Sequence, residues 1–211
     1  MDMTIYHTIN WFFAFSFIGY LLECTVLSYE NRSPVLNRGF GHGPFCVIYG
    51  FGALGASLIL EPLAGQPVEL YFASMVMATS MELVTAHIMI KLFGAFWWDY
   101  SQKRFNLNGR VCANTLIPFG LLGLTMVYLV KPFLFGLFAG IPVTVKHVVC
   151  GALLALMLTD VAVSTTILGK VRKTAEDAKG DSTEAITRVV REKLAEQGAL
   201  VRRLLLAFPY A

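Results

Sequence analysis

Three acidic residues lie inside long apolar runs of the sequence, where a charged side chain is unfavourable. Glu23, Glu82 and Asp160 each stand in a stretch rich in Ile, Leu, Val and Met. A charge at the centre of a membrane helix costs about 2.5–3.5 kcal/mol on insertion scales. Small or hydroxyl residues accompany each acid at helical spacing, which favours a face turned toward other helices. The acids are therefore candidates either for a polar site within a bundle or for pairs that only hold the bundle together.

Two polar segments could bring hydrogen-bonding groups and counter-charges to these acids. The first spans residues 37–52, and its glycines permit tight turns and the close approach of a ligand. The second spans residues 97–110. Arg38 and Arg110 are the expected counter-charges of the buried acids. Together with the three acids, the candidate substrate-binding residues are Arg38, His42, Asp99, Asn106, Asn108 and Arg110.

The sequence contains none of the motifs that would indicate catalysis, nucleotide binding or metal coordination. It has no Gly-x-Ser-x-Gly, His-Glu-x-x-His or Walker A sequence. The four cysteines are widely spaced and form no zinc-ligand pattern, so they are expected to be packing residues: Cys24, Cys46, Cys112 and Cys150. We expect no catalytic residue, no metal and no cofactor.

The composition is that of a membrane protein. Hydrophobic residues make up 56% of the chain and charged residues 15%, against about 45–50% and 25% in ordinary globular domains. We predict an all-α, polytopic transmembrane bundle of about five spans, at residues 4–28, 44–61, 68–93, 111–130 and 145–168. The second span is short and glycine-rich. If this segment dips into the membrane and returns to the same side, four spans remain. Lys131-Pro132 is expected to end the fourth, making 133–141 an interfacial or re-entrant piece.

The distribution of Lys and Arg predicts the orientation. With the N-terminus outside and the C-terminus in the cytoplasm, every Lys and Arg except Lys131 and Lys146 lies on the cytoplasmic side. In this arrangement the three acids share the cytoplasmic half of the bilayer, facing both polar segments. The expected location is the cell membrane, with the lipid bilayer as partner and no nucleic acid.

The C-terminal part of the chain differs in kind from the rest. We divide the chain into a transmembrane helical domain, residues 1–168, and a basic cytoplasmic tail, residues 169–211. Apolar residues recur in the tail at helical spacing with arginines between them, which predicts an amphipathic helix. Such a helix could lie on the anionic inner leaflet, or pack against a partner subunit or a second copy of the chain.

The two polar segments resemble those of a known family. Asn37-Arg38-Gly39-Phe40, Gly43-Pro44-Phe45 and Tyr49-Gly50-Phe51-Gly52, together with Trp97-Trp98-Asp99-Tyr100-Ser101 and Phe105-Asn106-Leu107-Asn108-Gly109-Arg110, are similar to the bacterial membrane-protein family called Putative ABC-transporter type IV, or CmpB-like. The likeness extends over roughly residues 9–168. It departs at His42, where an aromatic residue is expected, and at Val47, where proline is common, which weakens the transfer of fine ligand preference.

The resemblance implies a permease-like subunit that works with a nucleotide-binding ATPase, and a homodimer is a candidate assembly. We therefore expect a membrane transport component with a polar site in the cytoplasmic half of the bundle. A structural or regulatory membrane subunit is the first alternative. An integral-membrane enzyme acting on a lipid head group, using Glu82, Asp99, Asp160 and His42, is the second.

Overall fold

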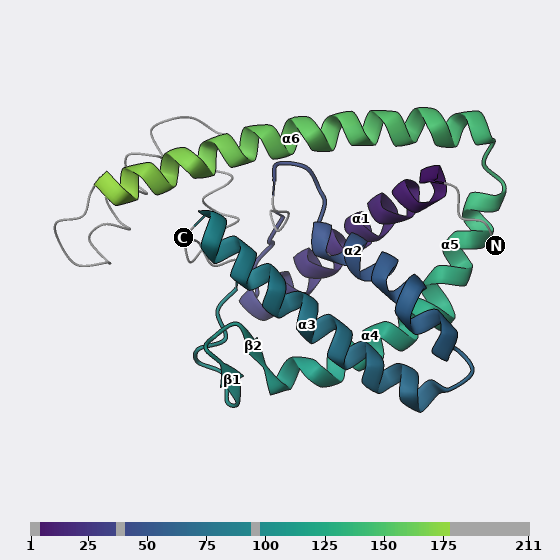
Figure 1. Cartoon of the computed structure of the whole chain (residues 1–211), viewed down its shortest axis with the longest axis horizontal. Coiled ribbons are helices and arrows are strands. Elements are labelled where there is room, and N and C mark those ends of the chain that lie inside the picture. The colour runs from purple at the N-terminus through teal and green to yellow at the C-terminus, as the bar shows by residue number, and fades with distance from the viewer. Residues whose placement is uncertain (1–4, 37–40, 94–97, 178–211) are drawn as a thin grey trace.

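The computed structural model describes residues 5–36, 41–93 and 98–177, and it is almost entirely helical (Figure 1). The elements in order are α1 (Ile5–Asn31), α2 (Val47–Gly55), η1 (Ala56–Leu60), η2 (Glu61–Leu63), α3 (Pro67–Phe93), β1 (Asn106–Leu107), β2 (Val111–Cys112), η3 (Ala113–Thr115), α4 (Leu116–Thr125), η4 (Met126–Val130), α5 (Lys131–Ala139) and α6 (Val143–Asp177). The predicted all-α class is confirmed. Arg38 and residues 178–211 lie outside the described residues, so the predicted tail helix and the 168/169 boundary remain predictions.

Four of the described helical segments are long and apolar enough to cross a membrane. They are Ile5–Asn31, Pro67–Leu92, Ala113–Ala139 and Val143–Thr166. The predicted second span forms a shorter apolar helix, Val47–Leu63. At 1.5 Å per residue it is about 25 Å long, slightly less than a hydrocarbon core of about 30 Å. Residues 5–36, 41–93 and 98–177 therefore form a multi-pass bundle of four long helices and one short helix.

The predicted break at Lys131-Pro132 is wrong. The helix continues through α4, η4 and α5, and Ala113–Ala139 is one apolar segment. Proline normally interrupts a helix because it lacks an N–H and clashes with the carbonyl four residues earlier. Here the preceding turn, Met126–Val130, is a wider π-helix, and Pro132 falls at the start of α5. The wider turn accommodates the ring, so residues 133–139 extend the span.

A compact set of apolar side chains joins α1, α2 and η1 to α3 and the α4–α5 segment. Its buried members are Trp11, Phe15, Ala53, Ala56, Leu60, Leu70, Met126 and Leu134. The helices approach closely where glycine replaces a side chain. A Cβ at Gly50 would collide with the Ser16 hydroxyl, and a Cβ at Gly123 would collide with the Ser74 hydroxyl. Small residues of this kind let membrane helices pack backbone to backbone.

Helix α6 runs along one side of the molecule (Figure 1). Most of its side chains between Val143 and Thr166 are exposed. Near its start, Asn10 Nδ2 donates to the Lys146 carbonyl over 3.2 Å, and the Tyr6 and His147 rings lie 3.9 Å apart. Further along, Asp160 contacts His42. Polar contacts therefore hold α6 at two positions along its length.

Candidate functional site

Two of the three predicted acids are hydrogen-bonded by tyrosines. Tyr49 donates to Glu23 Oε1 over 2.7 Å, and Tyr100 donates to Glu82 Oε1 over 2.9 Å. Burial, and then the neighbouring Glu82, raise the pKa of the Tyr100 phenol, so it remains a donor. Glu23 is close enough for its charge to act on both Glu82 and Tyr100. The structure thus brings Glu23 and Glu82 into one polar group.

Only one of the two carboxylate oxygens of Glu82 has a hydrogen-bond partner among the described residues. The residue is 6% exposed, and among the described residues Oε2 has no hydrogen-bond partner. The hydroxyl of Thr79, one turn earlier on α3, is also buried without a partner there. Buried polar atoms nearly always have a partner, and an unpartnered one needs an explanation such as a bound ion or water. The side chains of Ser16, Ser57 and Arg110 also have one buried atom without a partner there, but Glu82 and Thr79 are neighbours on one helix and one of the two is ionisable. This pair therefore points to a ligand.

The pair α1–α2 and the pair α3–α4 share several features. Residues 51–55 and 119–123 both read Phe-Gly-x-Leu-Gly. Each is followed by a π-helical turn, and then by a charged residue and a proline, Glu61-Pro62 or Lys131-Pro132. Each pair also has one of the serine–glycine contacts described above, and each first helix carries an acid bonded by a tyrosine. These shared features are of the kind an internal repeat has, although the serine-contacting glycine precedes the motif in the first pair (Gly50) and ends it in the second (Gly123). The polar group takes one acid and one tyrosine from each pair.

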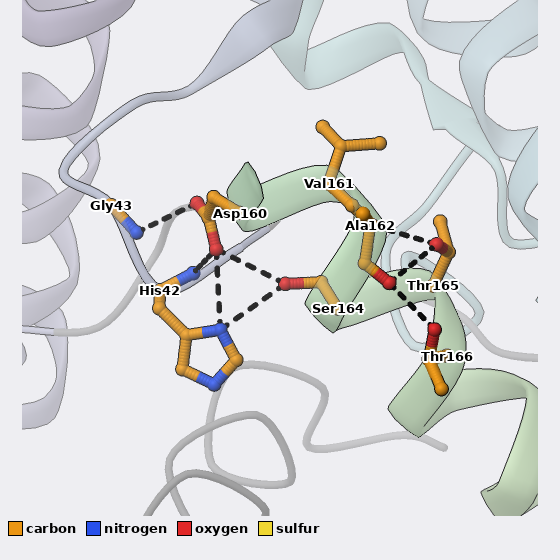
Figure 2. Close-up of polar contacts among 8 residues, drawn as sticks. All are labelled: His42, Gly43, Asp160, Val161, Ala162, Ser164, Thr165 and Thr166. Atoms are coloured by element: carbon orange, nitrogen blue, oxygen red, sulfur yellow. Dashed lines mark hydrogen bonds and ion pairs between the residues drawn. The ribbon is translucent and has the colours of Figure 1, made fainter. Parts of the chain in front are cut away.

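Asp160 lies in a second contact group, shown in Figure 2. Its two carboxylate oxygens accept the backbone N–H groups of His42 and Gly43 over 2.7 and 2.8 Å. The His42 ring and the Ser164 hydroxyl each lie 3.2 Å from Oδ1. A Cβ at Gly41 would collide with the carboxylate. We call this set of contacts among His42, Gly43, Asp160 and Ser164 the Asp160 clamp, and it fastens the loop before α2 to α6.

The clamp contains the residue types of a nucleophilic triad but not its geometry. A triad histidine uses one ring nitrogen toward serine and the other toward the acid. Here the same atom, His42 Nδ1, lies 3.2 Å from both Ser164 Oγ and Asp160 Oδ1. Ser164 is also completely buried. This arrangement suits attachment of a loop to a helix and does not suit proton relay.

Residues 99–112 form a short hairpin that positions Tyr100. The turn Leu107–Arg110 closes with a 3.0 Å bond from Arg110 N–H to Leu107 O, and its central residues Asn108 and Gly109 have φ of 52° and 69°. This is the geometry of a type I′ turn, for which Asn-Gly is a strong signal. The strands β1 and β2 pair Asn106 with Cys112.

The polar side chains of the hairpin satisfy its own backbone. Asn106 donates to the carbonyls of Ser101 and Lys103 and accepts the Gly109 N–H. Asp99 accepts from the backbone and the hydroxyl of Ser101. Of the hairpin residues predicted to bind substrate, Asp99, Asn106 and Asn108 therefore build the loop that carries Tyr100.

The described structure pairs Arg110 with a histidine and not with an acid. One guanidinium nitrogen contacts His87 Nε2, while Arg110 Nε is buried without a partner among the described residues. Trp98 donates to the Arg110 carbonyl over 2.8 Å. Arg110 forms no ion pair with an acid among the described residues, so its role as a counter-charge stays a prediction. The same expectation for Arg38 lies outside the described residues.

The hydroxyl residues Thr79 and Ser164 were expected on the faces of Glu82 and Asp160, but the tyrosines of the site were missed. Tyr49 and Tyr100 were not predicted as the hydrogen-bond partners of Glu23 and Glu82. Tyr49 and Tyr100 belong to the two polar segments, and a buried acid needs a donor, so the signal was present. No group of three or more His, Cys, Asp or Glu that could hold a metal occurs within residues 5–36, 41–93 and 98–177.

The helical fold and its long apolar helices define a multi-pass, all-α membrane protein. The model of the family Putative ABC-transporter type IV matches residues 10–165, and the chain belongs to that family. Membership places it among transport-related membrane proteins. Comparison with curated proteins and with solved structures finds no match.

Proposed function

We propose that the chain is a permease-like transport subunit whose polar site is the group formed by Glu23, Tyr49, Glu82 and Tyr100. The half-satisfied carboxylate of Glu82 carries the proposal. An ionisable group buried within a span is expensive, and in membrane proteins such groups commonly mark a substrate or ion pathway. The features shared by the two helix pairs support the same conclusion, because transporters often bind their substrates where structural repeats meet.

The proposed orientation puts this site in the cytoplasmic half of the cell membrane, with the N-terminus outside. The hairpin beside Glu82 carries Lys103 and Arg104, and the loop after α1 carries Arg32. The opposite turn, residues 61–66, has no basic residue. The positive-inside rule therefore favours a cytoplasmic hairpin. A nucleotide-binding ATPase is the proposed partner, and a homodimer is the proposed assembly of the permease.

The test compares solute accumulation in membrane vesicles carrying the wild-type chain, Glu82→Gln or Glu69→Gln. Glu69 is an exposed acid in the first turn of the same helix and serves as the matched control. Vesicles prepared from the protein's own membrane, with its partners present, are supplied with ATP and a metabolite extract, and their contents are measured by mass spectrometry. We expect at least one solute to accumulate with wild type and Glu69→Gln and not with Glu82→Gln. Equal contents with and without the chain would contradict transport.

A structural subunit is the second candidate, and the Asp160 clamp favours it. There an intramembrane acid is used to attach a loop to α6, and both of its oxygens accept a backbone N–H. On this alternative, Glu82→Gln lowers the melting temperature and the activity of any complex together. On the transport proposal, the variant assembles normally and only accumulation is lost.

A further inference from the structure

The unpartnered oxygens of Thr79 and Glu82 lie on one face of α3. Residues three apart in a helix are neighbours on its surface. Both atoms are buried, and neither has a hydrogen-bond partner in the described part of the chain, so they do not bond each other either. Leaving two such atoms unsatisfied in a membrane is unfavourable. One ligand that contacts both would remove both penalties.

The chemistry of the group specifies the charge of that ligand. Glu82 already accepts from Tyr100 at Oε1, and an ionised carboxylate can only accept. Glu23, a second acid, acts on Glu82 electrostatically, which makes the group favour positive charge. Glu82 forms no ion pair with a described residue. The ligand must therefore supply positive charge.

Three ligands can be compared on this basis. A proton on Glu82 would neutralise the carboxylate but would give neither Oε2 nor the Thr79 hydroxyl a hydrogen-bond partner. A water molecule could contact both oxygens but would bring no charge. A small monovalent cation can contact both and neutralises the carboxylate. Carboxylate and hydroxyl oxygens are hard donors that suit such ions.

We propose that Glu82 and Thr79 bind a small monovalent cation, either an alkali ion or an ammonium group, beside the Tyr100 hydroxyl. The inference rests on the proposed function for the role of the ion, because it gives the polar site its ligand class. A divalent metal is disfavoured, since the described residues provide no group of three or more His, Cys, Asp or Glu suited to hold one.

The test measures the thermal unfolding midpoint of the purified full-length protein in detergent against cation concentration. Sodium, potassium and ammonium chloride are titrated separately against choline chloride at constant ionic strength and pH. At least one small cation should raise the midpoint saturably. Comparing sodium and potassium with ammonium then shows whether the site binds an alkali ion or an ammonium group. Glu82→Gln and Thr79→Val should weaken the apparent affinity by about tenfold or more. Glu69→Gln and Ser80→Ala, exposed changes on the same helix, should leave it unchanged.

Thr79→Val is close to isosteric, so it carries the test if Glu82→Gln fails to fold. An equal response to all four salts would overturn the inference. So would a response that both variants retain, or a midpoint that depends on pH alone, which would indicate protonation of Glu82. Cation binding without solute accumulation would count against the transport proposal only. Accumulation with no cation effect would count against this inference only.

Discussion

The ammonium group of Lys131 forms an ion pair with the carboxylate of Glu61. Each residue directly follows a π-helical turn and directly precedes a proline. The Lys131 ammonium also lies 5.9 Å from the centre of the Trp11 ring. The pair therefore connects the ends of η1 and η4 and joins both to α1, at the end of the bundle opposite the polar site.

Exchanging the two charges tests how much this ion pair stabilises the fold. The Glu61 side chain is 55% exposed and that of Lys131 18%, so we expect a coupling energy of no more than about 1 kcal/mol. Lys131→Glu should lower the melting temperature, and adding Glu61→Lys should restore part of the loss. The restoration should be incomplete, because the cation near Trp11 remains absent. If the double variant loses more free energy of unfolding than the two single variants lose together, the ion pair does not stabilise the fold.

The Asp160 clamp predicts that Gly41 cannot carry a side chain. Gly41→Ala would place a methyl group on the Asp160 carboxylate, and we expect a loss of about 1–3 kcal/mol through the displaced amide bonds. Gly151→Ala is the control, because it lies on α6 with no atom within 4 Å of the added Cβ. The two melting temperatures in detergent provide the comparison. Equal values for the two variants would show that the clamp does not stabilise the protein.

Asp160→Asn separates the charge from the shape of the clamp. Asparagine keeps one acceptor oxygen, but its amide nitrogen cannot accept the second backbone N–H. The loop before α2 should therefore become more susceptible to limited proteolysis at Arg32, which is measured by mass spectrometry of the fragments. Thr159→Val, the neighbouring exposed position on α6, should leave the cleavage rate unchanged.

The hairpin turn requires glycine at position 109. Gly109 has φ of 69°, and an added Cβ would lie 2.8 Å from Asp99 Oδ1. We expect Gly109→Ala to destabilise the hairpin by about 1–2 kcal/mol and to move Tyr100 away from Glu82. Gly65→Ala meets no atom within 4 Å and is the control. A cation affinity that falls with Gly109→Ala and not with Gly65→Ala would confirm that the hairpin positions the site.

Thiol labelling tests the proposed orientation. The four native cysteines are buried, so single cysteines introduced at Asn31, Lys103 and Gly65 can be compared against them. An impermeant maleimide should label Asn31→Cys and Lys103→Cys from the cytoplasmic side only, and Gly65→Cys from outside only. Labelling of Gly65→Cys from the same side as Asn31→Cys, with Lys103→Cys labelled from the other side, would rule out a full crossing by the helix Val47–Leu63.

The sequence predicted the membrane class and the position of the acids, because both follow from hydropathy. It did not predict the continuation of the helix through Pro132, because the rule that proline ends a helix omits the wider π-turn before it. It also did not predict that His87 contacts Arg110. The type I′ turn at Asn108-Gly109 decides where Arg110 points, and no spacing rule indicates that His87 would be there. Tyr49 and Tyr100 reach their acids from loops and helix ends, so their pairing depends on tertiary structure.

The two π-helical turns bear on how insertions and deletions would act in this chain. A π-turn behaves as an α-helix that has accommodated one additional residue. Deleting a residue from η1 or η4 would restore a regular helix and leave the residues after it facing as before. Glu61 or Lys131 would keep its facing, but the proline behind it would lose the wider turn that admits its ring. The length of these two segments is therefore as constrained as their composition, although η1 itself carries no charge and no proline.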